Sequence, residues 1–239
     1  MSLLKDSEFY ISKRMGRAIM DYRMISEGDK IAVAVSGGKD SMTLLRLLLD
    51  RKAFVPIKYE VIAIHIDQGY PRSISAKLVK QFKKLKVKYH IKKIDVLRKT
   101  PKKDINCFWC SWNRRKALFE ESYKLGCTKV ALGHHMDDII ETILLNLFFQ
   151  GEISAMMPYQ KLFKGKITLI RPLAYVEERL IKRFVKEEKI THDSCVCPHS
   201  ETSKRATMGK IIAKIEKDCP DVKKNIFRSV SRVKKEYLL

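Results

Sequence analysis

The stretch Ile31-Ala-Val-Ala-Val35-Ser36-Gly37-Gly38-Lys39-Asp40-Ser41 decides the fold of this chain. Its apolar first half predicts a buried strand, and the apolar spacing from Met42 to Leu49 predicts a helix directly after the glycines. A helix N-terminus behind a glycine-rich turn binds anions, because the backbone can approach the ligand and the helix dipole is positive there. Ser36 and Ser41 add hydroxyl donors and Lys39 adds a cation, whereas Asp40 would favour the dipole or hold a bridging Mg²⁺. The stretch therefore predicts a phosphate site.

This loop differs from the Walker P-loop, which has four residues between its glycines before Lys-Ser/Thr. It resembles the PP-loop of ATP pyrophosphatases, enzymes that cut ATP between its α and β phosphates. The resemblance implies ATP binding by Ser36, Gly37, Gly38, Lys39, Asp40 and Ser41. It also implies adenylation of a substrate oxygen, with release of pyrophosphate.

Composition indicates a basic globular protein of the cytoplasm. The 239 residues are 45% apolar, enough for a sizeable core, and no segment approaches the 18 uninterrupted apolar residues of a membrane-spanning helix. The first ten residues lack a signal-peptide pattern, so we expect a cytosolic chain without membrane contact. With 49 Lys and Arg against 27 Asp and Glu, the net charge is +22. That charge is typical of a nucleic-acid partner, although a lysine-rich background composition would also produce it.

Strand-like and helix-like segments alternate along the chain. Five strands are expected, at Ile31–Val35, Tyr59–Ile66, near Tyr89–Val96, Lys129–Leu132 and Ile167–Ile170. The helices are expected around Phe9–Tyr22, after the glycine loop, and at Ser73–Lys86, Ser111–Leu125, Asp137–Phe149 and Val176–Glu188, with two basic helices hinged at Pro220 between Ser203 and Tyr237. This alternation predicts an α/β fold with a doubly wound, mostly parallel five-stranded sheet, whose ligands bind beyond the carboxyl ends of the strands.

Three regions follow from this pattern. We expect an N-terminal helical segment over residues 1–28, a PP-loop ATP-binding domain over 29–190, and a basic helical segment over 191–239.

Four of the six cysteines form two close pairs, Cys107-Phe-Trp-Cys110 and Cys195-Val-Cys197. A two-residue spacer turns both sulfurs toward one metal, whereas a one-residue spacer suits chelation less well. Three thiolates with an open position suit a [4Fe–4S] cluster, four suit structural zinc, and a lone CxxC suits redox chemistry. Spacing leaves all three open. Cys127 and Cys219 are expected to be packing or incidental thiols.

Carboxylates gather after the fourth expected strand, in Gly133-His-His-Met-Asp137-Asp138, with Glu141 and Thr142 one turn further on. Acids at a helix N-terminus are often there for the dipole alone. Because the strand end also faces the phosphate loop, we interpret Asp138 as a Mg²⁺ ligand. His134 and His135 are expected to be structural hydrogen-bonding residues.

The order of these motifs resembles the tRNA thiolation enzymes of the 2-thiocytidine synthetase type, from about Met15 to the C-terminus. The resemblance is carried by Glu27-Gly-Asp-Lys30, the 36–41 loop, His65-Ile-Asp67, Cys107-x-x-Cys110, Gly133 to Thr142, Arg171-Pro-Leu-Ala-Tyr175 and Cys197. It implies a [4Fe–4S] cluster on Cys107, Cys110 and Cys197, the last because it stands eight residues before Arg205. It also implies that adenine lies near His65 and Ile66, and that Gly133 belongs to the nucleotide site.

The implied reaction adenylates O2 of a pyrimidine in tRNA, with Mg²⁺ on Asp40 or Asp138, and then replaces that oxygen with sulfur. Arg114, four residues after Cys110, would stabilise developing charge, or would contact phosphate or solvent. Cytidine 32 is the favoured target. The dipeptide Pro198-His199 resembles the sequence found in the sister enzymes that make 2-thiouridine, so a uridine target stays open. Sulfide, a cysteine desulfurase or a sulfur-carrier protein would donate sulfur, and a homodimer is possible.

Two different functions compete with tRNA thiolation. An amide-forming PP-loop synthetase would use the same ATP loop but would not need the cysteines. A zinc-stabilised RNA-binding protein would use the cysteines but would not split ATP.

Three basic segments are expected to contact tRNA phosphates: Lys83–Lys93, Arg98–Lys103 and Lys204–Lys235. Phe108, Trp109 and Trp112 offer stacking surfaces for bases, or pack around the cluster to exclude water.

Overall fold

A six-stranded sheet forms the centre of the computed structural model, which describes residues 6–69, 73–95, 107–193 and 204–237, with the side chains of Cys107 and Phe108 excepted. The strand order is β3-β2-β1-β4-β6-β5. The strands are β1 (Lys30–Ala34), β2 (Glu60–Asp67), β3 (Lys88–Lys93), β4 (Lys129–Ala131), β5 (Tyr159–Leu162) and β6 (Ile167–Ile170). All neighbouring strands pair in parallel except β5, which runs antiparallel to β6. The sheet is doubly wound and mostly parallel, as predicted.

The prediction of five strands was wrong by one, because β5 carries no apolar signal. Gln160 and Lys161 are exposed, and Tyr159 and Leu162 are only half-buried. β5 is an edge strand that pairs with β6 alone, in the register Tyr159 with Ile170 and Leu162 with Ile167. An edge strand needs little burial, so its sequence lacks the apolar run or strict alternation by which strands are recognised.

The helices are α1 (Asp6–Asp21), α2 (Lys39–Arg51), α3 (Ser75–Lys84), α4 (Cys107–Lys124), α5 (Met136–Gln150), α6 (Glu178–Glu187), α7 (Lys204–Ile215) and α8 (Val222–Ser229), with short 3₁₀ turns η2 (Phe163–Gly165) and η3 (Lys235–Tyr237). Helix α4 begins four residues earlier than the predicted Ser111. Helices α7 and α8 flank Pro220, where the hinge was expected. In the described segments, no helix combines the length and apolar character needed to cross a bilayer.

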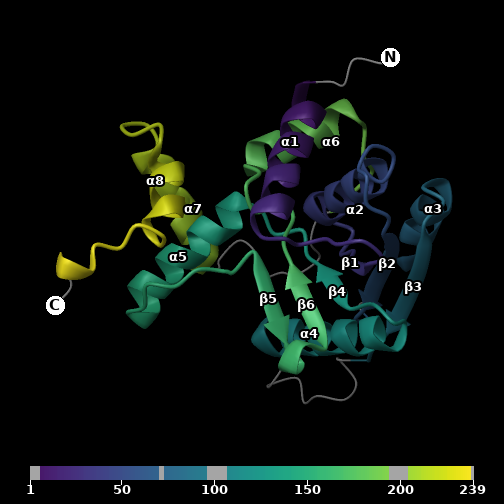
Figure 1. Cartoon of the computed structure of the whole chain (residues 1–239). Coiled ribbons are helices and arrows are strands. Elements are labelled where there is room, and N and C mark those ends of the chain that lie inside the picture. Colours follow the sequence, from purple (N-terminus) through teal and green to yellow (C-terminus); the bar gives the residue numbers. More distant parts are fainter. Residues whose placement is uncertain (1–5, 70–72, 96–106, 194–203, 238–239) are drawn as a thin grey trace.

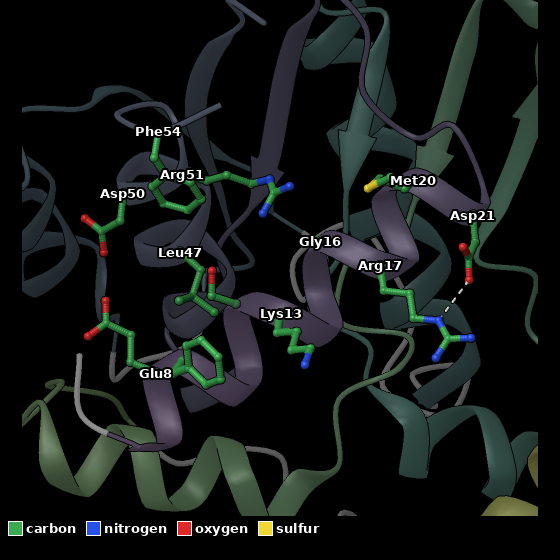
Figure 2. Close-up of a pocket in the computed structure, with 12 residues that line it drawn as sticks. Glu8, Lys13, Gly16, Arg17, Met20, Asp21, Leu47, Asp50, Arg51 and Phe54 are labelled. Atoms are coloured by element: carbon green, nitrogen blue, oxygen red, sulfur yellow. Dashed lines mark ion pairs between the residues drawn. The ribbon is translucent and has the colours of Figure 1, made fainter. Parts of the chain in front are cut away.

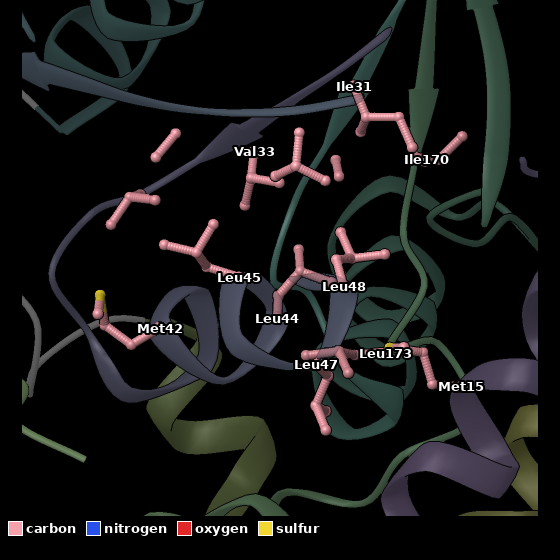
Figure 3. Close-up of a cluster of buried hydrophobic side chains, with 14 of the residues drawn as sticks. Met15, Ile31, Val33, Met42, Leu44, Leu45, Leu47, Leu48, Ile170 and Leu173 are labelled. Carbon is pink, nitrogen blue, oxygen red and sulfur yellow. The ribbon is translucent and has the colours of Figure 1, made fainter. Parts of the chain in front are cut away.

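Period-two alternation along β1 sends side chains to two different cores. Ile31 and Val33 join α1, α2, α3 and α6 on one face of the sheet, where the leucines of α2 fill the layer (Figure 3). Ala32 points to the other face, against α4. Figure 1 shows α4 set apart from α1, α2 and α6 across the sheet. One long helix therefore covers the second face.

Helices α5, α7 and α8 form a separate layer beside the sheet (Figure 1). Ile140 and Leu144 of α5 are buried with Met208 and Ile212 of α7 and Val222 of α8. The predicted 191–239 segment therefore packs, through α7 and α8, on a helix that belongs to the predicted 29–190 domain. The three-part division of the chain stays a prediction.

Candidate active site

The carboxyl ends of β1, β2 and β4 lie next to one another, because these strands are parallel neighbours. The loop after β1 contains Ser36–Ser41, β2 ends at Asp67, and the turn after β4 contains Gly133 to His135. Residues that lie far apart in sequence therefore meet at one edge of the sheet, where ligands of such folds bind.

Hydroxyl groups close the 36–41 loop on itself. The Ser41 hydroxyl donates to the Gly38 carbonyl (2.9 Å), and the Ser36 amide donates to the Ser41 hydroxyl oxygen (3.2 Å). The Gly38 amide donates to the Ser36 hydroxyl oxygen at 3.3 Å. These hydrogen bonds fix the shape of the loop directly before the first turn of α2.

Two glycines permit close approach at this loop. Gly37 has φ +86°, and a Cβ there would clash with the Ile74 side chain. A Cβ on Gly133 would lie 2.9 Å from the backbone of both Asp40 and Ser41. The turn after β4 thus packs directly against the N-terminus of α2, which places the acids of α5 beside the phosphate loop.

His65 lies at the end of β2 with 7% of its surface exposed. Its Nδ1 lies 2.8 Å from the Val35 carbonyl, which can only accept, so Nδ1 carries the proton. Burial lowers the pKa of His65, against the raising effects of this hydrogen bond and of Asp67. The ring is therefore neutral at pH 7 and has an acceptor at Nε2.

Asp67, the last residue of β2, is hydrogen-bonded to the segment that leads from β2 to α3. It accepts hydrogen bonds from the hydroxyls of Ser73 (2.6 Å) and Ser75 (2.7 Å) and from the Gly69 amide (3.0 Å). Burial raises the pKa of Asp67, but these hydrogen bonds outweigh that effect and the pKa lies below its ordinary value.

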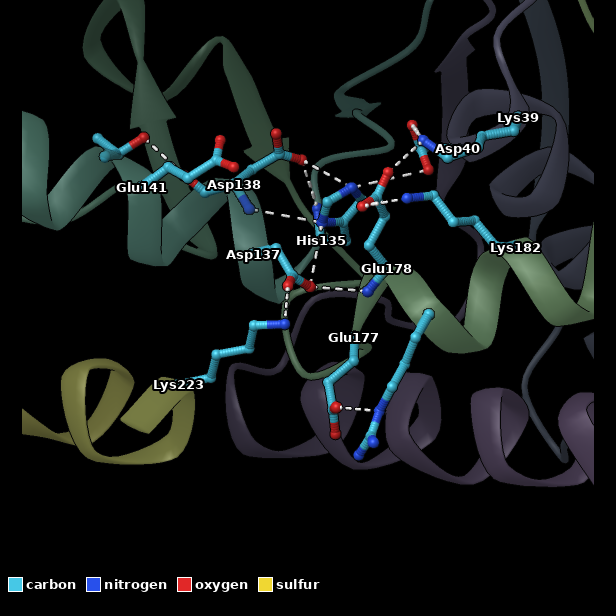
Figure 4. A network of polar contacts seen from close by, with 12 residues as sticks. Lys39, Asp40, His135, Asp137, Asp138, Glu141, Glu177, Glu178, Lys182 and Lys223 are labelled. Atoms are coloured by element: carbon cyan, nitrogen blue, oxygen red, sulfur yellow. Dashed lines mark hydrogen bonds and ion pairs between the residues drawn. The ribbon is translucent and has the colours of Figure 1, made fainter. Parts of the chain in front are cut away.

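A polar network joins α2, α5 and α6 at this edge (Figure 4). His135 caps α5: its Nδ1 accepts from the Asp138 amide, so the ring proton is on Nε2. That Nε2 lies 3.7 Å from Asp40 Oδ1 and 3.5 Å from Asp138 Oδ2. Asp40 and Asp138, the two alternative Mg²⁺ ligands predicted from the sequence, therefore both lie close to one imidazole nitrogen.

Asp40 Oδ1 is buried and has no hydrogen-bond partner among the described residues. A buried carboxylate oxygen without a donor is costly unless a ligand satisfies it. In the described segments, no three His, Cys, Asp or Glu side chains already gather as a metal site. Mg²⁺ commonly takes one or two carboxylates and completes its shell with water and phosphate. The donor set at Asp40 and Asp138 fits Mg²⁺ that arrives with a nucleotide.

The adjacent acids Asp137 and Asp138 have different partners. Asp137 Oδ2 accepts from the Glu178 amide at the start of α6 (2.7 Å), and its Oδ1 pairs with Lys223 of α8 (3.2 Å). Asp138 Oδ1 pairs with Arg205 of α7 at 3.2 Å. Asp138 Oδ2 also accepts from the His135 amide at 3.0 Å. Both acids therefore join α5 to another helix, and Asp138 in addition lies 3.5 Å from the His135 Nε2 that faces Asp40.

The Lys39 ammonium pairs with Asp40 (3.1 Å) and with Glu178 of α6 (2.9 Å). Burial raises the pKa of Glu178, but hydrogen bonds from Lys182 and Lys39 outweigh it and lower the pKa to about 2. A bound polyphosphate would compete with these carboxylates for the ammonium. Nothing in the local sequence around Glu178 signals this role, because its partner is on another element.

A second group of charges surrounds Asp138. Arg205 donates to Thr142 at 3.2 Å and lies 3.7 Å from Glu141. Burial raises the pKa of Glu141 to about 7; Arg205 opposes this and the neighbouring carboxylates add to it. Arg171, 7% exposed, donates to His134 Nδ1 at 3.3 Å. Burial lowers the pKa of His134 to about 4, so its ring is neutral.

Cys110 lies at the same edge of the sheet, because of a contact with Gln68 that the local sequence does not predict. The Gln68 side-chain amide, one residue past β2, donates to the Cys110 carbonyl at 3.1 Å. Arg114 is exposed one turn further along α4, near enough that its charge lowers the pKa of His65. The first turn of α4 therefore lies beside the carboxyl end of β2. Cys197, the side chain of Cys107 and the basic segment Arg98–Lys103 lie outside the described residues.

The remaining cysteines of the described segments pack in a hydrophobic core or against one. Cys127 is 1% exposed against the α4 face of the sheet, and burial raises the pKa of its thiol. Cys219 packs with α5, α7 and α8. Both positions agree with a packing role.

Comparison with known proteins gives a consistent picture. A family model described as a PP-loop domain matches residues 9–208. The tRNA-cytidine(32) 2-sulfurtransferase of Geobacter sulfurreducens is 40% identical over 235 residues, which are 96% of this chain and 91% of that protein. The enzyme of the same name from Geotalea uraniireducens is 40% identical, with 100% and 98% covered.

Among solved structures, the U34-tRNA thiolase NcsA from Methanococcus maripaludis, with its [4Fe-4S] cluster, superposes with a TM-score of 0.78. Its sequence is 24% identical, with 98% of this chain and 81% of that chain covered, so this likeness supports the fold alone.

Proposed function

The chain belongs to the PP-loop family and, within it, to the tRNA-cytidine(32) 2-sulfurtransferases, and on that premise we propose that it is an ATP-dependent tRNA sulfurtransferase. The favoured reaction converts cytidine 32 of tRNA to 2-thiocytidine. One observation carries the proposal: the Gln68–Cys110 hydrogen bond joins the cysteine helix to the strand edge that holds the phosphate loop. Thiolation needs those two parts at one site, whereas an amide-forming PP-loop enzyme has no need of the cysteines.

The nucleotide would lie on the 36–41 loop. The free amides at the start of α2 and the Lys39 ammonium would bind its phosphates, and Asp40 with Asp138 would hold Mg²⁺ against them. The adenine would lie against His65 and Ile66 at the end of β2. Gly133 would contribute by letting the turn after β4 pack closely on the backbone of Asp40 and Ser41.

In the first step, O2 of the target base attacks the α-phosphorus. The bond to the β-phosphate breaks, pyrophosphate leaves, and the base carries an adenylate on O2. Lys39 and Mg²⁺ would offset the charge that develops on the phosphates. Arg114, exposed beside His65, would stabilise negative charge on the base or on the departing AMP.

In the second step, sulfide attacks C2 of the base and AMP departs with the original oxygen. A [4Fe–4S] cluster on three cysteines would supply one iron without a protein ligand, as a place to hold sulfide. Cys107 and Cys110 are the first and fourth residues of α4. The third ligand is predicted to be Cys197, because its spacing of eight residues before Arg205 resembles that of the last cysteine in the family.

The target base must leave its stack to reach this edge, which is easiest in a tRNA loop. Sulfide, a cysteine desulfurase or a sulfur-carrier protein would supply sulfur. A cytoplasmic location follows from the tRNA substrate, and a homodimer is compatible with the fold.

The test is anaerobic incubation of the protein with ATP, sulfide and unmodified tRNA, followed by mass spectrometry of the nucleosides. We expect 2-thiocytidine that depends on ATP and disappears in a Cys110→Ser variant. A product of 2-thiouridine would move the target to a uridine. Absence of any thionucleoside, in protein that contains its cluster, would contradict the proposal.

A matched pair tests the third cysteine. We expect Cys197→Ser to lose the cluster and the thiolation activity, and Cys195→Ser to keep both. The reverse result would overturn the assignment of Cys197.

A further inference from the structure

A groove of about 540 Å³ lies between α4 and the β5–β6 hairpin, outside the nucleotide site. Its floor contains the buried side chains of Phe119 and Ile167. Its walls are three aromatic rings that are largely open to solvent: Trp112 (46% exposed), Tyr123 (59%) and Phe163 (59%). Flat apolar rings around an open groove suit a planar ligand.

The aromatic rings are held in place by their neighbours. The Phe163 ring meets Phe119 edge to face at 5.7 Å between centroids, which fixes the hairpin turn on α4. Trp109 and Trp112 stack nearly parallel, at 15° and 5.7 Å. The Lys116 ammonium lies 5.4 Å from the centre of the Trp112 ring. A base entering the groove would meet surfaces that are already ordered, so little entropy would be lost there.

The hairpin turn holds Phe163 in a left-handed backbone conformation. Phe163 and Lys164 both have positive φ, at 51° and 56°. Residues other than glycine are disfavoured in this conformation, because the Cβ atom crowds the backbone carbonyl. Tight turns between antiparallel strands often use such left-handed residues, and this turn places the Phe163 ring at the groove.

The rim is cationic. Among the described residues that line the groove, Arg115, Lys116 and Lys166 stand against a single acid, Glu120. Aromatic faces with cations around them are the chemistry by which proteins bind unpaired nucleotides, since the bases stack and the phosphates are neutralised.

A second groove on the opposite face of the sheet provides the contrast (Figure 2). It lies between α1 and α2, has a similar volume of about 530 Å³, and also contains exposed aromatic rings, Phe9 and Phe54. Its lining has as many acids as cations: Glu8, Asp21 and Asp50 balance Lys13, Arg17 and Arg51. That balance does not suit a polyanion, so the aromatic rings alone do not distinguish the two grooves.

One helix, α4, leads from the proposed active site to the groove. Trp112 is two residues from Cys110, whose carbonyl is bonded to Gln68 at the strand edge. Phe119 is nine residues from Cys110, so the floor of the groove lies about 14 Å along the helix axis, at ~1.5 Å per residue. A nucleotide near the target base in the same RNA chain would reach this distance.

We propose that this groove binds an unpaired nucleotide of the tRNA close to the modified one, with its base stacked on Trp112 and Phe163 and its phosphate at Arg115, Lys116 and Lys166. The inference rests on the proposed function for the identity of the RNA. It assigns the groove a role in substrate selection, because a paired RNA strand has no splayed base to place there.

The experiment measures binding of a labelled anticodon stem–loop RNA by fluorescence anisotropy, and steady-state thiolation of the same RNA. Phe163→Ala is the main variant, because Phe163 is remote in sequence from the cysteines, and Lys166→Glu tests the rim. We expect both variants to weaken RNA binding and to raise KM. For Phe163→Ala the change should be about 5- to 100-fold, the loss typical of one base stack. The kcat at saturating RNA should change by less than about threefold, since no group that contacts the reacting atoms is altered.

Phe54→Ala is the matched control. Phe54 is equally exposed, at 62%, and also has a cation near its ring, Arg51 at 5.6 Å. It should leave both RNA binding and KM unchanged.

Abasic RNAs identify the nucleotide. Each loop position of the stem–loop is made abasic in turn, and one position should weaken binding to the native protein but cause no additional loss in Phe163→Ala. The only tryptophans in the chain are Trp109 and Trp112, so quenching of tryptophan emission by the intact RNA, and less by that abasic RNA, is a further expected result.

The proposal is overturned if Phe163→Ala and Lys166→Glu bind and thiolate RNA like the native protein. It is also overturned if they change only the KM of a sulfur-donor protein, or if they change only self-association. Failure of the proposed function is a separate result: the native protein would then form no thionucleoside, while anisotropy would still report whether RNA occupies the groove.

Discussion

At the scale of single residues, the neighbouring carboxylates Asp137 and Asp138 show how the fold separates structure from chemistry. Both lie in the first turn of α5, and both are bonded: Asp137 to the Glu178 amide and Lys223, Asp138 to the His135 amide and Arg205. Asp138 alone also lies across the His135 Nε2 from the unsatisfied oxygen of Asp40. An acid at a helix N-terminus has a favourable dipole interaction in either case. The different roles of Asp137 and Asp138 therefore depend on which side chains of other elements lie near each carboxylate.

Asp138→Asn should therefore lower the rate of ATP-dependent pyrophosphate release by about 100-fold or more, because a metal-binding charge is lost while shape is kept. Release of pyrophosphate in the presence of tRNA is the measurement. Asp137→Asn is the control, since it keeps an acceptor for the Glu178 amide; its rate should stay within about threefold, with a melting temperature a few degrees lower. Equal losses in the two variants would contradict the different roles given to these acids.

Glu141 makes stability depend on pH. Its pKa is about 7 in the folded chain against an ordinary 4.5, first because of burial and then because of nearby carboxylates, with Arg205 opposing. The folded state therefore binds this proton more tightly than the unfolded state. The stabilisation from Glu141 is complete below pH 4.5 and is lost as the pH rises through 7.

The melting temperature of Glu141→Gln, relative to the native protein, should accordingly increase between pH 5 and pH 8. His134, with its pKa lowered to about 4, acts in the opposite direction but equally in both proteins, so the difference isolates Glu141. Thermal unfolding across this range is the measurement. A difference that stays constant with pH would show that Glu141 has an ordinary pKa.

At the scale of elements, α4 and α7 connect the site to the rest of the chain in different ways. Helix α4 covers one whole face of the sheet and has its first turn at the carboxyl edge, through Cys110 and Gln68. Helix α7 packs on α5, and its Arg205 contacts Asp138, Glu141 and Thr142. The helix that follows the predicted third cysteine is thus bonded to the predicted Mg²⁺ ligand.

Arg205→Ala should loosen α7 from α5. Hydrogen exchange of residues 204–215, followed by mass spectrometry, should become about fivefold faster, a modest effect because Arg205 is 40% exposed. Lys210→Ala, at an exposed position of the same helix, should leave the exchange unchanged. If the two variants exchange alike, Arg205 does not anchor the helix.

At the scale of the whole molecule, the net charge of +22 is the dominant property. The paired acids at the active site neutralise their own cations, as Glu178 does with Lys39, whereas the described lining of the groove beside α4 has three cations to one acid. The excess charge is therefore available for the RNA backbone, outside the nucleotide site.

The affinity for tRNA should fall steeply with salt. If six to ten phosphates are contacted, the loss between 50 and 200 mM salt is about 10³- to 10⁵-fold. Dissociation constants measured by anisotropy across that range give the slope, and the ATP dissociation constant measured in parallel is the control, expected to change far less. A tRNA affinity that hardly changes would show that the charge reflects only a lysine-rich composition.

The sequence by itself determined the nucleotide half of this protein. The strand, the glycine loop and the helix that follow one another from Ile31 are contiguous, and the bonds that shape the loop join residues at most five positions apart, as in Ser36 with Ser41. Local spacing is enough to specify such a structure. The same reasoning placed β1, β2, β4 and β6, because each is a mostly buried apolar run.

The tertiary structure alone decided which side chains complete the site. Gln68 reaches Cys110 across 42 residues, and Arg205 reaches Asp138 across 67. Strand β5 and the groove between α4 and the hairpin were equally absent from the local pattern, since an edge strand has no buried run and a groove belongs to two elements at once. Contacts of this kind leave no periodic trace in the sequence, because they depend on how the sheet brings distant strand ends and helices together.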